Sequence, residues 1–322
     1  MQTRHIGCAC AFLLLAAVTG VILHSLWFSY TFVIQVDGEP SPQRSMARAD
    51  LHLLAGGSNL SPKAFYCPLL IQEKGWTFSQ RGKPMRQRPI DVLYRSSNCV
   101  PEREALVSTL RQYVEDAGFN FVASGKCVAG GNRSPSAAGS RNWGECNECQ
   151  DAKMIVSFEN YADGLEYLSE KLFLPLEFGA VPLYHGNGHR LMHACGVNTE
   201  RVIDASNFPD YSLFCQHVVD MLRSPWRLQE LADRDYGDLC FDKLWEPVEQ
   251  FTSTLPRVQS LARKRKIRVL AWAQPPRMQS WLPRVLHVDS SRIEYVSMGP
   301  YDVVLVGCCF GPTTLPGKFI PV

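Results

Sequence analysis

The polar residues best suited to chemistry gather between residues 154 and 186, which read MIVSFENYADGLEYLSEKLFLPLEFGAVPLYHG. The apolar run at the start predicts a strand that ends at Glu159 and Asn160, and a helix is expected to follow with Glu170 and Lys171 near its beginning. A helix N-terminus beside a lysine favours an anion, and a carboxylate can accept hydrogen bonds from sugar hydroxyls. Taken singly, these residues favour an ordinary surface helix with a Glu–Lys pair.

A second polar group follows an earlier predicted strand, at residues 90–95. The segment SNCVPER, residues 97–103, leads from that strand into a helix predicted over 102–113, which puts Arg103 in its first turn. A guanidinium grips two phosphate oxygens at once and keeps its charge, so Arg103 suits a diphosphate. A solvent-exposed arginine is the alternative for this residue considered alone.

The elements that must position these residues alternate along the chain. Strands are predicted at 119–125, 154–158, 181–184 and 201–204, and helices at 168–178 and 211–222. This alternation predicts an α/β fold with βαβ units and a parallel sheet of Rossmann-like topology. Neither GxGxxG nor GxxxxGK[ST] occurs, so a dinucleotide fingerprint and a P-loop are not supported.

Taken as a string, this region resembles the donor-binding signature of the α1,3/4-fucosyltransferases. The matching pieces are Phe158-Glu159-Asn160, Tyr167, Ser169-Glu170-Lys171 and Gly179-Ala180-Val181-Pro182. Ser169 stands where the family has Thr, and the loop between Asn160 and Tyr167 is one residue longer. Upstream, Ser97-Asn98-Cys99 followed by Arg103 resembles the family's contact with the donor diphosphate. The resemblance covers about residues 88–250.

The resemblance implies a GT-B-like glycosyltransferase with one clear Rossmann-like donor domain. It implies transfer of L-fucose from GDP-fucose to a glycan or glycoprotein acceptor, by inversion and with an α1,3 linkage. The donor-binding residues that it implies are Arg103, Asn160, Tyr167, Glu170 and Lys171. No required metal cofactor is implied, stimulation by Mn²⁺ is left open, and no catalytic residue can be assigned.

The chain termini and composition bear on the compartment. Residues 6–30 carry no Asp, Glu, Lys or Arg, which predicts a transmembrane signal anchor after a cytoplasmic tail of residues 1–5; a cleaved signal peptide is the alternative. We therefore expect a single-pass type II protein of the Golgi or endoplasmic reticulum membrane with a lumenal body. Two sequons, at Asn59 and Asn132, agree with this. For Cys146 and Cys149, a disulfide is favoured over a zinc site.

Composition excludes two classes of protein. The 322 residues carry a net charge of only +2, which does not suit a nucleic-acid binder, and their 46% hydrophobic content excludes wholesale disorder. The histidines at positions 185, 189 and 193 are spaced by four, but glycines interrupt the spacing, so a loop with ordinary histidines is favoured over a metal site.

The predicted domain order leaves the acceptor domain unexplained. We expect a stem with little regular structure at 31–88, a GDP-fucose-binding domain at 89–255, and a partial second α/β unit at 256–322. The acceptor half is then rearranged, truncated or supplied by a partner subunit. Two further alternatives are a non-catalytic GDP-sugar-binding or scaffolding protein of the Golgi membrane, and a GT-B transferase that uses another nucleotide sugar.

Overall fold

The computed structural model describes residues 32–37, 51–54, 64–66, 76, 78, 83–96, 98–125, 127, 146–160, 166–261, 263–271, 282–296 and 302–307. The larger of two compact units comprises described residues between Leu53 and Glu246, and the smaller comprises described residues from both ends of the chain. The predicted anchor at 6–30 and the sequons at Asn59 and Asn132 lie outside the described residues. Within the described ranges, no helix combines the length and the apolar character needed to cross a bilayer.

The larger unit is built on a five-stranded parallel sheet with the order β5-β4-β6-β7-β8. Its strands are β4 (Ile90–Ser96), β5 (Phe121–Gly125), β6 (Ala152–Phe158), β7 (Val181–His185) and β8 (Ile203–Asp204). β5 follows β4 along the chain and lies at the edge of the sheet, whereas β6 lies on the other side of β4, so the winding direction reverses between β4 and β6. In sheets of this kind, ligands bind outside the carboxyl ends of the strands at that reversal. The predicted parallel sheet is confirmed.

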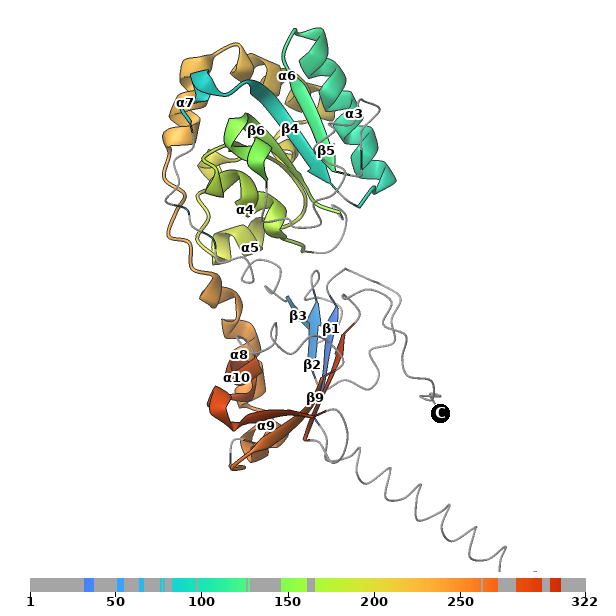
Figure 1. Ribbon diagram of the computed structural model, residues 1–322, viewed down its shortest axis with the longest axis vertical. Helices are drawn as coiled ribbons and strands as arrows, with labels where there is room; N and C mark the ends of the chain where they lie inside the picture. The colour runs from blue at the N-terminus through green and yellow to red at the C-terminus, as the bar shows by residue number, and fades with distance from the viewer. Residues whose placement is uncertain are drawn as a thin grey trace, which may run out of the picture. The chain divides into compact units, whose positions relative to one another are not determined.

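Helices cover both faces of this sheet (Figure 1). On one face, α3 and α6 pack together with alternate strand residues such as Val92 and Tyr94. On the other face, α4 packs through Leu174 against Leu93 and Ile155. The helices of this unit are α3 (Pro101–Asp116), α4 (Glu170–Glu177), α5 (His189–Ala194), α6 (Tyr211–Leu222) and α7 (Pro225–Asp233). Because both faces are covered, the strands are apolar almost throughout.

A six-stranded sheet brings the two ends of the chain together, with the order β10-β9-β11-β1-β2-β3. Its strands are β1 (Phe32–Asp37), β2 (Leu51–Leu54), β3 (Ala64–Tyr66), β9 (Ile267–Ala271), β10 (Ile293–Val296) and β11 (Val303–Gly307). β1 pairs in parallel with β11, and β9 pairs in parallel with β10 and β11. Near these strands in sequence are α8 (Glu246–Ser253), α9 (Pro256–Leu261) and α10 (Leu282–Leu286).

This sheet corrects one prediction. The segment 31–88, predicted as a stem with little regular structure, contains β1, β2 and β3. The partner of β1 is β11, at the opposite end of the chain, so the pairing leaves no local pattern in the sequence. The C-terminal strands are therefore completed by N-terminal ones, and the second α/β unit is assembled from both ends of the chain.

Two disulfides lie in the larger unit. Cys99 pairs with Cys127, and Cys146 pairs with Cys149. The disulfide role predicted for Cys146 and Cys149 is confirmed, and the structure adds that they pair with each other. Three further described cysteines, at positions 195, 215 and 240, are free thiols. Across the described ranges, no group of His, Cys, Asp and Glu side chains is arranged to hold a metal ion. Short 3-10 helices complete the description: η2 (Met85–Gln87), η4 (Asn147–Asp151), η5 (Thr199–Arg201), η6 (Ala205–Asn207), η7 (Phe241–Leu244) and η9 (Ser290–Arg292).

Candidate functional site

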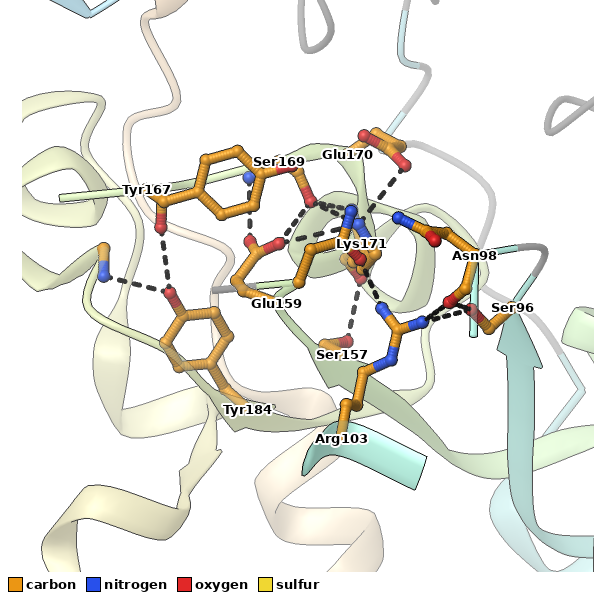
Figure 2. A network of polar contacts seen from close by, with 12 residues as sticks. Ser96, Asn98, Arg103, Ser157, Glu159, Tyr167, Ser169, Glu170, Lys171 and Tyr184 are labelled. Atoms are coloured by element: carbon orange, nitrogen blue, oxygen red, sulfur yellow. Dashed lines mark hydrogen bonds and ion pairs between the residues drawn. The ribbon is translucent and has the colours of Figure 1, made fainter. Parts of the chain in front are cut away.

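The predicted site residues meet at the carboxyl ends of β4 and β6, where the winding of the sheet reverses (Figure 2). β4 ends at Ser96 and is followed by Asn98, and β6 ends at Phe158 and is followed by Glu159 and Asn160. Glu159 and Asn160 are both buried. The strand order alone therefore marks this place as the expected ligand crevice of the unit.

Arg103 lies buried at the start of α3, with 3% of its surface exposed. Its Nη1 donates to Oδ1 of Asn160, and its Nη2 donates to Oγ of Ser96 at 2.6 Å and to the carbonyl oxygen of Asn98. Its buried Nε has no hydrogen-bond partner in the described part of the chain. The alternative of a solvent-exposed arginine is wrong, because the side chain joins the ends of β4 and β6.

The first turn of α3 adds a second source of positive potential. The helix begins at Pro101, and the preceding Val100 supplies no side-chain cap. The first amide N–H groups of a helix have no partner within the helix, and together with the helix dipole they favour an anion. Arg103 and the uncapped start of α3 therefore favour negative charge at the end of β4. Glu102 and Glu104 in the same turn oppose this effect, and Oε1 of Glu104 lies 3.7 Å from Nη2 of Arg103.

Lys171 lies in the first turn of α4, with 10% of its side chain exposed. Its Nζ donates to Oγ of Ser169 at 3.1 Å and lies 3.7 Å from Oε2 of Glu159 and 3.8 Å from Oε1 of Glu170. An ammonium has three N–H groups, and only one of them makes a hydrogen bond within the described residues. Lys171 thus keeps two donors that could bind the oxygens of an anion.

The buried carboxylate of Glu159 accepts hydrogen bonds from the residue that caps α4. Its Oε1 accepts from the amide of Ser169 at 2.8 Å, and its Oε2 accepts from the hydroxyl of Ser169 at 2.5 Å. Burial raises the pKa of Glu159 from 4.5 to about 6, although Lys171 and the Ser169 hydroxyl act in the opposite direction. Ser169 is in turn the N-cap, and its oxygen accepts from the amide of Lys171. The carboxylate therefore sets the position of both Ser169 and Lys171.

Glu159 is absent from the predicted donor-binding residues, but the structure shows that its carboxylate contacts both Ser169 and Lys171. The sequence placed it directly after a strand, which was the available indication. Its full burial depends on how α4 and β7 close over it, since its amide donates to the carbonyl of His185 at 2.9 Å. That packing is not visible in the local sequence.

Tyr167 and Glu170 flank Lys171 in different environments. Tyr167 is 1% exposed, and Nζ of Lys171 lies 6.0 Å from the centre of its ring. The hydroxyl of Tyr184, buried beneath, donates to the carbonyl of Tyr167 at 3.4 Å and accepts from the amide of Gly188 at 3.0 Å. Glu170 is only partly buried, so its carboxylate remains accessible to hydroxyl groups of a ligand. All five predicted site residues thus lie in the loops and helix starts that follow β4 and β6.

The three histidines do not come together. The ring of His185 packs edge-on against Phe158, with 5.5 Å between ring centres. Nε2 of His189 lies 2.5 Å from Oδ2 of Asp204 and 3.2 Å from the hydroxyl of Ser206. The described residues therefore offer no histidine cluster for a metal.

Chemically, this arrangement suits a ligand with two adjacent anionic groups. Two consecutive residues at the end of β6 hold the two cations: Asn160 accepts from Arg103, and Glu159 lies in an ion pair with Lys171. Charged hydrogen bonds of this kind contribute more in a partly buried site than at an open surface.

Comparisons with known proteins find similarity to parts of two kinds of protein. No protein-family model matches the chain. The chain is 27% identical over 110 residues to human GDP-fucose protein O-fucosyltransferase 3, an alignment that spans 34% of this chain and 22% of that protein.

Among solved structures, crystal structures of an α1,3-fucosyltransferase are similar at low identity. One gives a TM-score of 0.46 at 10% identity and covers 71% of this chain and 80% of that one. A second, with GDP-fucose, gives 0.48 at 12% identity and covers 69% and 75%. The chain is thus similar in part of its sequence to a human protein O-fucosyltransferase, of whose length the match spans about a fifth.

Proposed function

We propose that this chain is a glycosyltransferase that binds GDP-fucose between β4 and β6 and transfers L-fucose to a glycan or glycoprotein acceptor. The observation that carries the proposal is that two adjacent residues each hold one of the two cations. Glu159 and Asn160, adjacent at the end of β6, hold Lys171 and Arg103 at the point where the strand order predicts a ligand. A nucleoside diphosphate has the two adjacent anionic groups that such a pair would bind.

The proposed reaction breaks the bond between C1 of fucose and an oxygen of the β-phosphate while the acceptor oxygen forms a bond to C1 from the opposite face. Negative charge develops on the departing GDP, and Arg103 and Lys171 would stabilise it. The acceptor hydroxyl must lose its proton to a base, and we assign no residue to that role. Glu159 is unsuited to it, because its side chain is completely buried.

The remaining parts of the proposal follow from the sequence resemblance. A GT-B-like architecture would pair the larger unit, as the donor domain, with the smaller α/β unit. Inversion, an α1,3 linkage and a lack of any required metal belong to the same proposal, as do a membrane anchor at residues 6–30 and a location in the Golgi or endoplasmic reticulum. The two disulfides support a compartment that is oxidising.

The test is a transfer assay with the purified full-length chain and GDP-fucose labelled in the sugar. N-acetyllactosamine, an N-glycan and a glycoprotein serve as acceptors. We expect label in one acceptor class, and its loss in Lys171→Ala. Lys153→Ala is the matched control, because Nζ of Lys153 also makes an ion pair, with Asp91 at 2.5 Å. Both residues lie near the starts of their strands, at the end of the sheet opposite to the site.

The outcomes separate the alternatives. Binding of GDP-fucose without transfer to any acceptor would support a non-catalytic GDP-sugar-binding protein. Tighter binding of UDP-sugars than of GDP-fucose would support a transferase with another donor. Transfer that survives in Lys171→Ala would remove this residue from the site.

A further inference from the structure

Two free cysteines of the larger unit lie where two backbone segments meet. Cys195 ends α5, and Cys240 immediately precedes η7. The amide of Cys240 donates to the carbonyl oxygen of Cys195 at 2.9 Å, and the amide of Asn198 donates to the carbonyl oxygen of Tyr236 at 2.9 Å. The segments 195–198 and 236–240 are therefore fastened to each other at two points.

Two glycines bring these segments as close as backbones can lie. Gly196 and Gly237 have positive φ angles of 79° and 98°. A Cβ atom on Gly196 would lie 2.0 Å from the carbonyl oxygen of Asp238, and one on Gly237 would lie 2.0 Å from the carbonyl oxygen of Gly196. Only glycine fits at either position, so the close approach of the two segments is built into the sequence.

The backbone hydrogen bond limits the distance between the two cysteines. An N–Cα bond, the 2.9 Å hydrogen bond and a carbonyl group join the two Cα atoms, so these lie at most ~6.8 Å apart. Disulfides span Cα separations of about 4.4–6.8 Å. Burial, with a smaller contribution from the nearby Cys240, raises the pKa of the Cys195 thiol to about 12. The two Cα atoms thus lie within the range that a disulfide spans. In the structure the Cys195 thiol donates to the carbonyl oxygen of Met192 at 3.3 Å, a contact that the disulfide would replace.

We infer that Cys195 and Cys240 form a third disulfide in the mature protein. The two thiols lose two electrons and two protons, and a small-molecule disulfide such as glutathione disulfide is reduced to two thiols. Cys240 is partly exposed, so it reacts first: it forms a mixed disulfide and releases one glutathione thiol. The thiolate of Cys195 then attacks the sulfur of Cys240, and the second glutathione leaves.

Two features of the unit support this inference. Cys99–Cys127 and Cys146–Cys149 are already oxidised, which is typical of proteins in an oxidising compartment. The new bond would also be placed usefully, because Cys195 belongs to the apolar cluster that contains Leu172 of α4 and Tyr184 of β7. It would fasten the chain after α7 to the cluster that supports Lys171.

Peptide mapping of the full-length chain, secreted or membrane-bound from cells with an oxidising secretory pathway, tests this inference. Free thiols are alkylated in denaturant without reduction, and the chain is then digested. We expect a peptide pair linked through Cys195 and Cys240, with neither residue alkylated. Alkylation of both residues, or a link from either one to a different cysteine, would overturn the inference.

Variants give a second readout. In Cys240→Ser, Cys195 should become open to alkylation in denaturant, and the Tm of the larger unit should fall by roughly 10 °C. Cys215→Ser is the matched control, because Cys215 is another buried free thiol, and the Cys195–Cys240 link should persist in it. An identical alkylation pattern at Cys195 in wild type and Cys240→Ser would also contradict the pairing.

Discussion

Replacing Glu159 with glutamine should remove a specific pH dependence of stability. The carboxylate of Glu159 is completely buried, and this burial raises its pKa from 4.5 to about 6. The folded protein therefore holds a proton on Glu159 at pH values where the unfolded chain has released it. As the pH rises from about 4.5 to 6, this group makes the folded state progressively less stable.

The magnitude follows from the size of the pKa difference. One pKa unit corresponds to 1.36 kcal/mol, so a rise from 4.5 to about 6 corresponds to a cost of about 2 kcal/mol for the ionised form. Glutamine does not titrate. The free energy of unfolding of the wild type, relative to that of Glu159→Gln, should therefore fall by about 2 kcal/mol between pH 4 and pH 7.

The assay is urea denaturation at several pH values, with hydrogen exchange of the β6 amides as the readout, so that the transition measured belongs to the larger unit. Glu115→Gln, which changes a carboxylate whose side chain is 43% exposed on α3, reports the effect of removing an exposed charge. A wild-type-minus-variant difference that stays flat would refute the reasoning. A difference that rises with pH would mean that Lys171 and Ser169 outweigh the burial of the carboxylate.

Three other predictions concern affinity and stability. Arg103→Lys should weaken GDP binding about tenfold by calorimetry, because an ammonium cannot bridge two acceptors as a guanidinium does. Arg103→Ala should bind GDP only somewhat more weakly than Arg103→Lys. Parent-like affinity for GDP in both variants would mean that Arg103 does not belong to the site. Replacing both Cys99 and Cys127 by alanine should lower the free energy of unfolding by roughly 3–4 kcal/mol, because the disulfide closes a loop with a sequence separation of 28; an unchanged urea midpoint would argue against it. Asp210→Ala should cost about 1 kcal/mol and Asp210→Asn much less, because Oδ1 of Asp210 caps α6 by accepting from the amide of Leu213 at 2.9 Å; equal losses in both variants would contradict the cap.

The fold of the larger unit could be predicted because its information is local. The helix predicted over 211–222 occurs as α6 with the same limits, where apolar spacing and the Asp210 cap agree. The strand predicted at 201–204 shrinks to β8 (Ile203–Asp204), because residues 199–201 form the 3-10 helix η5 instead. Such differences at element ends reflect hydrogen bonding that the pattern of side chains does not specify.

The pairing of β1 with β11 could not be predicted in the same way. Each strand carries a short apolar run, but their partnership joins opposite ends of the chain. The stem interpretation came from the Pro-, Gly- and Arg-rich segments around β1 and β2, which outweighed those short runs. A strand of four to six residues gains most of its stability from its neighbours, and the sequence around it does not name them.

In the candidate site, the residue types were predictable and their contacts were not. Arg103 and Asn160 were both expected to contact a donor, and the structure adds that Nη1 of Arg103 donates to Oδ1 of Asn160. Glu159 was missed because a glutamate after a strand is ordinary, whereas a fully buried one is not. Burial is a property of the assembled unit, so only the structure reveals it.

The central claim is that Lys171 and the groups around it bind the diphosphate of a guanine nucleotide. Isothermal titration of GDP into the full-length chain, into Lys171→Ala and into the control Lys153→Ala tests it most directly. A charged hydrogen bond contributes about 1.5–3 kcal/mol, so the Kd for GDP should rise at least about tenfold in Lys171→Ala, while Lys153→Ala binds like the parent. Unchanged GDP affinity in a folded Lys171→Ala protein, or no binding of GDP to the parent chain, would contradict the account.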